Sequence, residues 1–471
     1  MADLSGASTL GPEPAPIELG KSLKSRHVAM ISIGGIIGAG LFVGSSASIA
    51  SVGPAIVLSY LIAGAVVLGV MRMLGEMAVA IPGKGFVDYI RIGLGDWAGF
   101  VSGWLYWYFW VIVVAVEAIA GASLMHNWID IPGMSDNVQI AAIGLVLLLA
   151  LTGVNLLSAR SYGEFEFWFA SIKVAAILVF IAIAGAYALG IGSPTGPTFE
   201  NLYIHRGFAP FGWTAVLAGV VSAFFALGGG EIATIAAAES AEPARNVAKM
   251  TTSIVLRILL FYVGSVFLIV TILPWTSVVP GQSPFAAALA LMKIPGAATI
   301  MNLIVLTAVL SCLNSGLYVT SRVLFTLADK EHAPKAMVAL NRRRVPARAI
   351  LIGSVFGYVA ILVSVISPQL VFAFLLNASG AIIIFVYLLA ALAQIRLRPR
   401  LERDDPEALK LKMWLFPWLS YAVVAGIVAV LVAMALTPTL ASQLWVSLLS
   451  LAVVVVAYLA TRARRGRGAR A

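Results

Sequence analysis

The sequence predicts an all-α integral membrane protein with twelve transmembrane helices. Of its 471 residues, 61% are hydrophobic and 11% are charged, which is more apolar surface than a water-soluble domain can bury. Windows of about 20 mostly apolar residues, long enough to cross a bilayer, recur twelve times along the chain. Glycine clusters interrupt two of these windows, a pattern that is typical of transporters.

Short polar loops separate the expected spans, and both chain ends are polar. Residues 1–20 predict a disordered cytoplasmic tail without a secretory signal, residues 21–462 a single transporter domain, and residues 463–471 a basic cytoplasmic tail. The spans are expected at approximately 28–49, 54–80, 98–126, 138–157, 165–190, 211–236, 250–273, 297–327, 348–366, 370–395, 413–436 and 441–461.

The net charge of +10 comes from basic residues that gather on one side of the membrane. Lysines and arginines precede span one and follow spans two, four, six, eight, ten and twelve, whereas the opposite loops hold only Arg206 and Lys293. The positive-inside rule therefore predicts that both termini are cytoplasmic. The Arg-rich tail favours contact with anionic membrane lipid over nucleic acid, and nothing in the sequence indicates an obligate protein partner.

The two interruptions predict an internal repeat. Span one contains GGIIGAG from Gly34, and span six contains GGGE from Gly228. If span six is the counterpart of span one, the repeat unit is five helices, and an odd number places the second unit in the opposite orientation. We expect repeat one at 28–190, repeat two at 211–395 and two peripheral helices at 413–461. The segment 281–295 is interpreted either as a short external helix over the entrance or as an ordinary loop.

The broken first span predicts a binding site for a zwitterion. Unwinding would expose the amides of Ala39 and Gly40 at the start of a half-helix, whose positive end favours a carboxylate. Carbonyl groups upstream, between Ile36 and Gly38, would face an ammonium group. The alternative is that these glycines serve only close helix packing.

The break in span six supplies the other side of that predicted site. Carbonyl groups of Phe225, Ala226 and Gly228 would border the break, and the ring of Phe225 could cover a bound ligand. Plain packing is the alternative for this ring.

Charged residues within the spans are expensive to bury and are therefore candidates for proton coupling. Burial of Lys173 disfavours its charged form, so this lysine could release a proton, with the hydroxyl groups of Ser311 and Ser315 as contacts. A permanent structural salt bridge with a glutamate is the alternative. Glu231 is interpreted as a functional or a structural polar centre. Glu117 could bind a substrate amine, exchange a proton or be a protonated structural residue.

Other polar and aromatic groups are given structural interpretations. Glu76 is expected to form an ion pair with Arg72 on the same helix. Cys312, the single cysteine, is expected to pack in span eight, as are the aromatic residues of span three, Tyr106, Trp107 and Trp110. The four histidines form no ligand-spaced pair, and no phosphate loop or hydrolytic triad is present, so no metal, cofactor or enzyme activity is predicted.

Several segments resemble a known family. RHVAMISIGGIIGAGLFVGS from Arg26, EFEFWFASIKVAAIL from Glu164, GGGEIATIAAAESAEPARNV from Gly228 and SCLNSGLYVTSRVLFTLA from Ser311 are similar to the amino acid transporter family of bacterial permeases, within the amino acid-polyamine-organocation superfamily. EIATIAAAES and the Cys-Leu-Asn-Ser segment are most similar to γ-aminobutyrate permeases. The resemblance implies a LeuT-like fold of two inverted five-helix repeats plus two helices.

The resemblance also implies a function. It implies import of an amino acid with a proton across the bacterial cytoplasmic membrane by alternating access, most simply of γ-aminobutyrate or a related ω-amino acid. It implies carboxylate binding by Ala39 and Gly40 at the span-one break, and it matches Lys173 to the family's span-five lysine. It also implies amine binding by the carbonyl groups of Ile36, Phe225, Ala226 and Gly228. Relatives often carry a larger residue at the position of Gly230, so this glycine is interpreted as leaving extra volume in the pocket. A permease for aromatic, basic or small neutral α-amino acids is the alternative, and a substrate-gated channel or nutrient sensor is an alternative of a different class.

Overall fold

The computed structural model describes residues 37–82, 84–157, 160–231, 245, 254–255, 257–343 and 345–468, and over these residues it is all-helical. Eight of its helices are long and apolar enough to cross a membrane, which indicates a multi-pass membrane protein. They are α4 (Ile56–Ala80), α6 (Asp96–Met125), α7 (Asp136–Leu157), α8 (Arg160–Ala188), α14 (Ala297–Asp329), α16 (Pro368–Asp404), α17 (Trp418–Leu436) and α18 (Pro438–Gly468).

Shorter apolar helices lie where spans one, six, seven and nine are expected. In span one, α2 (Ala39–Phe42) is followed by α3 (Gly44–Val52), and in span seven a π-helical segment, η2 (Ile258–Gly264), continues into α12 (Ser265–Ile272). Spans six and nine contain α9 (Gly212–Leu227) and α15 (Ala347–Val363). Ile36 and the glycines before it lie outside the described residues.

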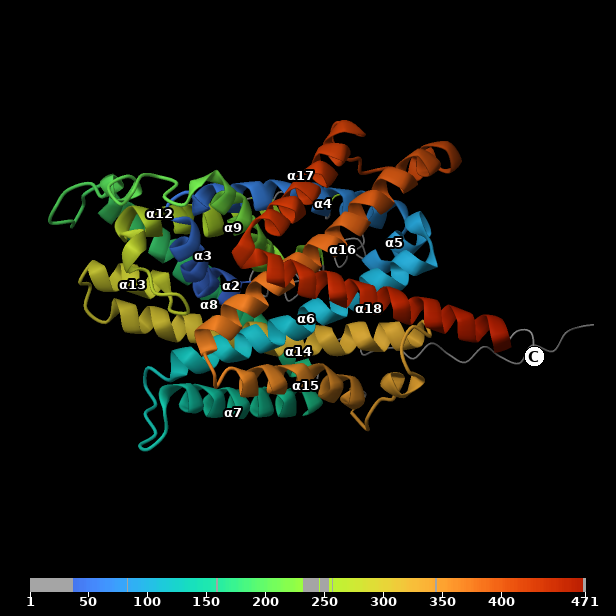
Figure 1. Ribbon diagram of the computed structural model, residues 1–471, viewed down its shortest axis with the longest axis horizontal. Helices are drawn as coiled ribbons and strands as arrows, with labels where there is room; N and C mark the ends of the chain where they lie inside the picture. The colour runs from blue at the N-terminus through green and yellow to red at the C-terminus, as the bar shows by residue number, and fades with distance from the viewer. Residues whose placement is uncertain are drawn as a thin grey trace, which may run out of the picture.

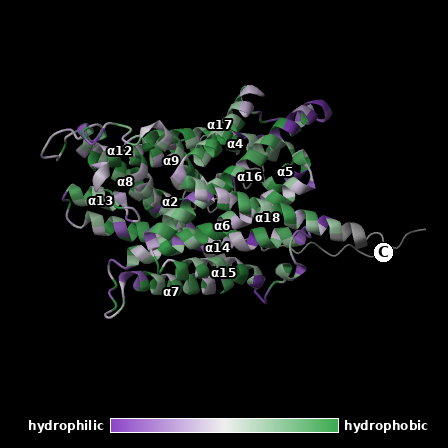
Figure 2. Ribbon diagram, viewed as in Figure 1, coloured by the Kyte–Doolittle hydropathy of each residue, from purple (hydrophilic) through white to green (hydrophobic). Residues whose placement is uncertain are grey.

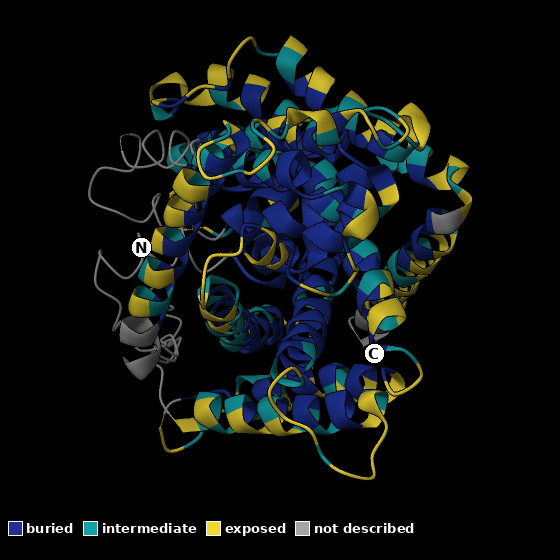
Figure 3. Cartoon of the chain, turned by 90° about the vertical axis from the view of Figure 1, so that its left-hand side faces the viewer, coloured by how far each residue is buried: buried dark blue, intermediate teal, exposed yellow. Residues whose placement is uncertain are grey.

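The long helices α7, α14, α16 and α18 and the shorter α15 contact α6 (Figure 1). Hydrophobic residues cover most of the helical surface, and hydrophilic residues gather toward the ends and in the loops (Figure 2). A view from one end shows a buried centre surrounded by exposed residues (Figure 3). Many exposed side chains are large and apolar, such as Leu149, Trp168 and Leu449, as expected for helices that face lipid.

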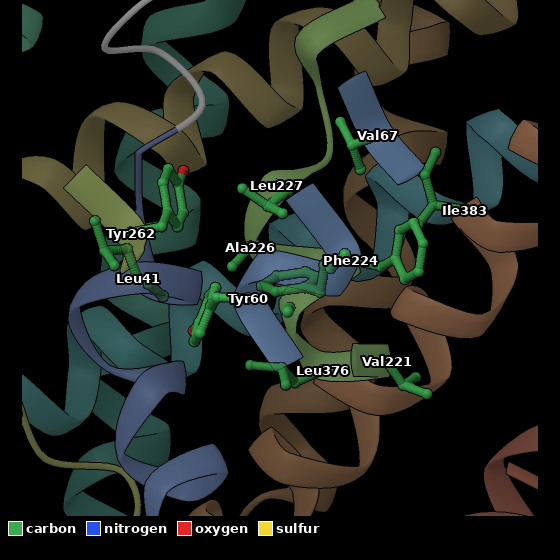
Figure 4. Close-up of a cluster of buried hydrophobic side chains, with 14 of the residues drawn as sticks. Leu41, Tyr60, Val67, Val221, Phe224, Ala226, Leu227, Tyr262, Leu376 and Ile383 are labelled. Carbon is green, nitrogen blue, oxygen red and sulfur yellow. The ribbon is translucent and has the colours of Figure 1, made fainter. Parts of the chain in front are cut away.

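Both expected interruptions are visible where the chain is described. α9 ends at Leu227, Gly228 is extended, and Gly229 has φ +95°, a conformation that favours glycine. Gly38 is also non-helical, with φ −138° and ψ −144°, and α2 begins at the next residue. Side chains of α2, α4, α9 and α16 pack closely around these breaks, among them Leu41, Tyr60, Phe224 and Ile383 (Figure 4).

One end of the molecule carries a cavity under a short helix. The segment predicted as either a helix or a loop contains α13 (Pro284–Leu291), and two 3-10 helices, η1 (Phe199–Leu202) and η3 (Trp275–Ser277), also belong to the connecting segments. The ring of Phe285 in α13 lies 5.0 Å from the ring of Phe42 and 4.7 Å from that of Phe180. A cavity of about 370 Å³ is lined by the ends of α6 and α16 and by α13.

The other end carries α5 (Phe86–Leu94), η4 (Lys335–Val338) and η5 (Pro406–Ala408). Lys330, at the end of α14, donates a hydrogen bond of 2.5 Å to Asp88 of α5. Burial acts to raise the pKa of Asp88, but the hydrogen bond and charge of Lys330 outweigh it, so this pKa lies below its usual range.

The expected ion pair between Glu76 and Arg72 is wrong. Glu76 instead forms a buried ion pair with Arg398 of α16 and accepts a hydrogen bond of 2.7 Å from Gln394. The guanidinium of Arg72 donates to the carbonyl of Lys412. Helical spacing predicts that the two charges of α4 pair with each other, but each instead pairs with a group from a distant segment of the sequence, Arg398 of α16 or Lys412 before α17.

Candidate functional site

A small cavity lies between the two interrupted helices. It has a volume of about 20 Å³, enough for one water molecule, and its walls come from α2, α6, α9 and α14. The predicted site residues Gly40, Glu117, Phe225, Ala226 and Gly228 all line it, together with Phe109, Trp110, Val113 and Cys312. The structure therefore brings together the two breaks and the acid of span three.

Glu117 occupies the position predicted for a ligand carboxylate. The N–H group of Ala39 lies 3.0 Å from each carboxylate oxygen of Glu117, and the Glu117 side chain is 1% exposed. A buried carboxylate requires such donors, because its desolvation is otherwise uncompensated. The first amide of α2 thus donates to a carboxyl group, and in this structure that group belongs to the protein itself.

Glycines allow the two interrupted helices to approach closely. A Cβ atom added to Gly40 would lie 2.9 Å from the Cα atom of Ala226 and 3.1 Å from the ring of Phe225. A Cβ atom on Gly228 would lie 2.9 Å from the ring of Phe109. These rings pack edge to face, with their centroids 6.3 Å apart, and form one wall of the cavity. The glycines therefore determine how narrow the cavity is.

Lys173 lies in a buried polar cluster beside the cavity. Its ammonium group donates a hydrogen bond of 2.9 Å to the hydroxyl of Ser311, so the predicted contact between these two residues is present. The hydroxyl of Ser311 lies 2.7 Å from both carboxylate oxygens of Glu166, and Lys173 and Glu166 form an ion pair of 3.8 Å. Glu166 is thus the acid beside Lys173.

Of the other two predicted coupling residues, Glu231 lies at the break in span six and Ser315 lies on α14. Glu231 accepts hydrogen bonds from the hydroxyl of Tyr387 at 3.0 Å and from the N–H group of Gly229 at 3.2 Å, so it stabilises the break in span six. Ser315 is buried on α14, four residues after Ser311. A Cβ atom on Gly230 would face Arg257 and Met71 at 3.4 and 3.5 Å. The Gly230 position therefore gives no extra volume to the cavity.

The sequence predicts packing roles for Trp110 and Cys312, yet both line the cavity, as does Val113, for which it makes no prediction. Trp110 and Val113 precede Glu117 by seven and four residues and so share its face of α6, a helical phase from which they could have been found. Cys312 follows Ser311 and also lines the cavity. The same reasoning applies to Glu166, which lies two helical turns before Lys173 on α8.

This arrangement suits the binding of a small polar molecule without covalent chemistry. The cavity combines backbone groups at two helix breaks, one carboxylate and an aromatic wall, which are groups that can orient a zwitterion. Over the described part of the chain, no group of three or more His, Cys, Asp or Glu residues could hold a metal ion.

Comparisons with known proteins agree with this geometry. The family model for amino acid permeases matches residues 27–467. A γ-aminobutyric acid permease of Bacillus subtilis is 47% identical over 95% of this chain and 94% of its own length. A γ-aminobutyric acid permease of Escherichia coli is 44% identical over 91% of each chain. An aromatic amino acid transport protein of Corynebacterium glutamicum is 39% identical over 88% of this chain and 89% of its own.

Proposed function

Since the chain belongs to the amino acid permease family, whose members are transporters and not enzymes, we propose that it imports γ-aminobutyrate or a related ω-amino acid with a proton. The observation that carries this proposal is the cavity between the two interrupted helices, with the N–H group of Ala39 already bound to a carboxylate. The two γ-aminobutyric acid permeases at 44% and 47% identity support the choice of substrate.

The proposed fold and location follow the sequence analysis. Twelve spans form two inverted five-helix repeats and two peripheral helices, in the bacterial cytoplasmic membrane, with both termini in the cytoplasm. The four shorter apolar helices support the count, since they complement the eight long ones. Anionic lipid is the expected partner of the basic loops and tail.

Binding proceeds by exchange of one carboxylate for another. The substrate carboxylate takes the amides of Ala39 and Gly40 and so displaces Glu117 from Ala39. Glu117 then remains a buried anion in the same cavity, where the ammonium group of the substrate provides the opposite charge. Carbonyl groups at Ile36, Phe225, Ala226 and Gly228 complete the ammonium site, and the ring of Phe225 closes over the ligand.

The transport cycle is alternating access coupled to Lys173. Protonated Lys173 holds α8 against α14 through Ser311, and loss of its proton weakens that contact and favours opening to the cytoplasm. Glu231 supports the cycle indirectly, by holding the break of span six through Gly229. Ser315 is a further hydroxyl of the same helix face as Ser311.

Transport by purified protein in liposomes tests this proposal. Labelled γ-aminobutyrate should accumulate against its gradient when the outside is acidic, and a protonophore should abolish the accumulation. Lys173→Ala should remove the response to the pH gradient. Undiminished accumulation by Lys173→Ala would refute the coupling role. If uptake by the unmodified protein stops when the inside and outside concentrations of substrate are equal, the result would favour a channel.

A second candidate is a permease for aromatic α-amino acids. The relative named for aromatic amino acid transport and the aromatic cavity wall of Phe109, Trp110 and Phe225 favour it. Competition of labelled γ-aminobutyrate uptake by a panel of unlabelled amino acids distinguishes the two, because the preferred substrate inhibits at the lowest concentration.

A further inference from the structure

A continuous chain of hydrogen bonds connects Lys173 to Glu166. The ammonium group of Lys173 donates to Ser311 at 2.9 Å, and the hydroxyl of Ser311 donates onward to Glu166 at 2.7 Å. The direct distance from the lysine nitrogen to the nearest carboxylate oxygen is 3.8 Å, which is too long for a hydrogen bond. Ser311 is therefore the bridge between the cation and the anion.

The chain of hydrogen bonds from Lys173 to Glu166 is shielded from water. The side chains of Lys173 and Glu166 are 0% and 1% exposed, and Ser311 is 2% exposed. A proton that leaves Lys173 in this environment needs an acceptor already in place, because no bulk water reaches the nitrogen. Ser311 and Glu166 are such an acceptor pair, and their hydrogen bonds already point from the lysine to the carboxylate.

The hydrogen bonds from Lys173 to Glu166 also have a direction relative to the membrane. Glu166 precedes Lys173 by seven residues on α8, about 10 Å along the helix axis. With the orientation proposed above, the start of α8 lies at the cytoplasmic side. Glu166 therefore lies on the cytoplasmic side of Lys173, where a released proton must go.

We propose that Ser311 and Glu166 form the relay through which Lys173 releases its proton to the cytoplasm. The proton on the lysine nitrogen passes to the oxygen of Ser311, while the hydroxyl proton of Ser311 passes to Glu166. Lys173 becomes a neutral amine, Ser311 is restored, and Glu166 becomes a neutral carboxylic acid. When the protein opens to the cytoplasm, Glu166 loses this proton to cytoplasmic water and regains its charge. This inference rests on the proposed proton-coupled function.

Among the described residues, two further ionisable groups that interact with Lys173 belong to the substrate cavity. Glu117 of α6 and Cys312 of α14 both interact electrostatically with Lys173, and both line the cavity. Within the described chain, Glu166 and Ser311 are absent from the cavity lining. Variants of these two residues therefore test proton release with little direct effect on substrate contacts.

The test compares two transport modes of the same proteoliposomes. Uptake driven by a pH gradient requires net proton release, whereas exchange of internal for external substrate does not. Glu166→Gln and Ser311→Ala should each reduce the rate of gradient-driven uptake at least about tenfold. This is less than the rate contribution of roughly 10²–10⁴-fold that a positioned proton-transfer group typically makes. Exchange by Glu166→Gln should stay within about twofold of the unmodified protein, because Glu166 does not line the substrate cavity.

Two further variants control for structural effects. Ser311→Thr retains a hydroxyl and should retain most gradient-driven uptake. Ser321→Ala removes another buried hydroxyl of α14, one that donates to the carbonyl of Tyr318, and should transport normally. Equal loss of exchange and uptake in Glu166→Gln, or equal behaviour of the Ala and Thr variants at position 311, would overturn the relay.

The outcomes separate the relay from the proposed function. If uptake by the unmodified protein does not depend on the pH gradient, or if uptake by Lys173→Ala still depends on it, the proposed proton coupling through Lys173 is itself wrong. If Lys173→Ala loses the response while Glu166→Gln and Ser311→Ala keep it, only the relay is wrong.

Discussion

Replacing Gly40 with alanine should push the two interrupted helices apart and weaken substrate binding. Gly40 lies within α2 and has no positive φ, so an alanine fits its backbone and the effect is purely steric. The added methyl group would lie 2.9 Å from the Cα atom of Ala226, whereas ordinary contact begins at 3.4 Å. The two backbones must therefore separate by about 0.5 Å.

The size of the effect follows from the cost of overpacking. Forcing one methyl group into a well-packed interior costs about 1–3 kcal/mol, which corresponds to roughly 5–150-fold in an equilibrium constant. The Phe225 ring, 3.1 Å from the added methyl group, can rotate, but the Ala226 backbone cannot yield without moving α9. We therefore expect the substrate concentration for half-maximal uptake to rise within that range.

The assay is concentration-dependent uptake of labelled γ-aminobutyrate by equal amounts of reconstituted protein. Gly153→Ala is the matched control, because a Cβ atom at this glycine of α7 meets nothing within 4 Å. It should transport normally. If Gly40→Ala binds substrate as tightly as Gly153→Ala does, the contact between the interrupted helices does not shape the binding site.

Three further predictions concern stability and selectivity. Glu76→Gln removes one of the two carboxylates that pair with Arg398, leaving only the more exposed Glu402, and should lower stability by about 1–3 kcal/mol, seen as a reduced melting temperature in detergent. Because the pKa of Asp88 is lowered, its pairing with Lys330 stabilises the fold at pH values above the usual pKa of an aspartate, and this stabilisation is lost as the pH falls through the folded-state pKa. On acidification, the melting temperature should therefore fall more for the native protein than for Asp88→Asn. Gly230→Ala should leave the inhibition profile of an amino acid panel unchanged, since the added methyl group faces away from the cavity lining.

Much of the site could be predicted from local sequence features. Glycine clusters weaken a helix wherever they occur, so their positions in the sequence predict both the break after Leu227 and the start of α2 at Ala39. The contact of Lys173 with Ser311 could be proposed because a buried ammonium group needs acceptors and few hydroxyls lie at its depth.

The rest depended on how helices rotate and pack against each other. Hydropathy gives the length of a span but little of its rotation, so Trp110 and Cys312 were assigned to packing although both line the cavity. The partner of Glu76 lies 322 residues away, at Arg398, and no helical spacing reports such a contact. Glu166 was overlooked because an acid near the start of a span resembles an ordinary interfacial residue.

The cavity at the two breaks has room for about one water molecule, far less than any amino acid requires. A substrate must therefore enlarge its own site, and the free energy of that expansion is subtracted from the affinity that the contacts alone would give. A substitution that removes side-chain atoms from the cavity wall lowers this cost and can tighten binding without adding a contact, whereas the methyl group added by Gly40→Ala occupies the site. Selection among amino acids then depends on which ligand repays the expansion, as well as on which ligand fits.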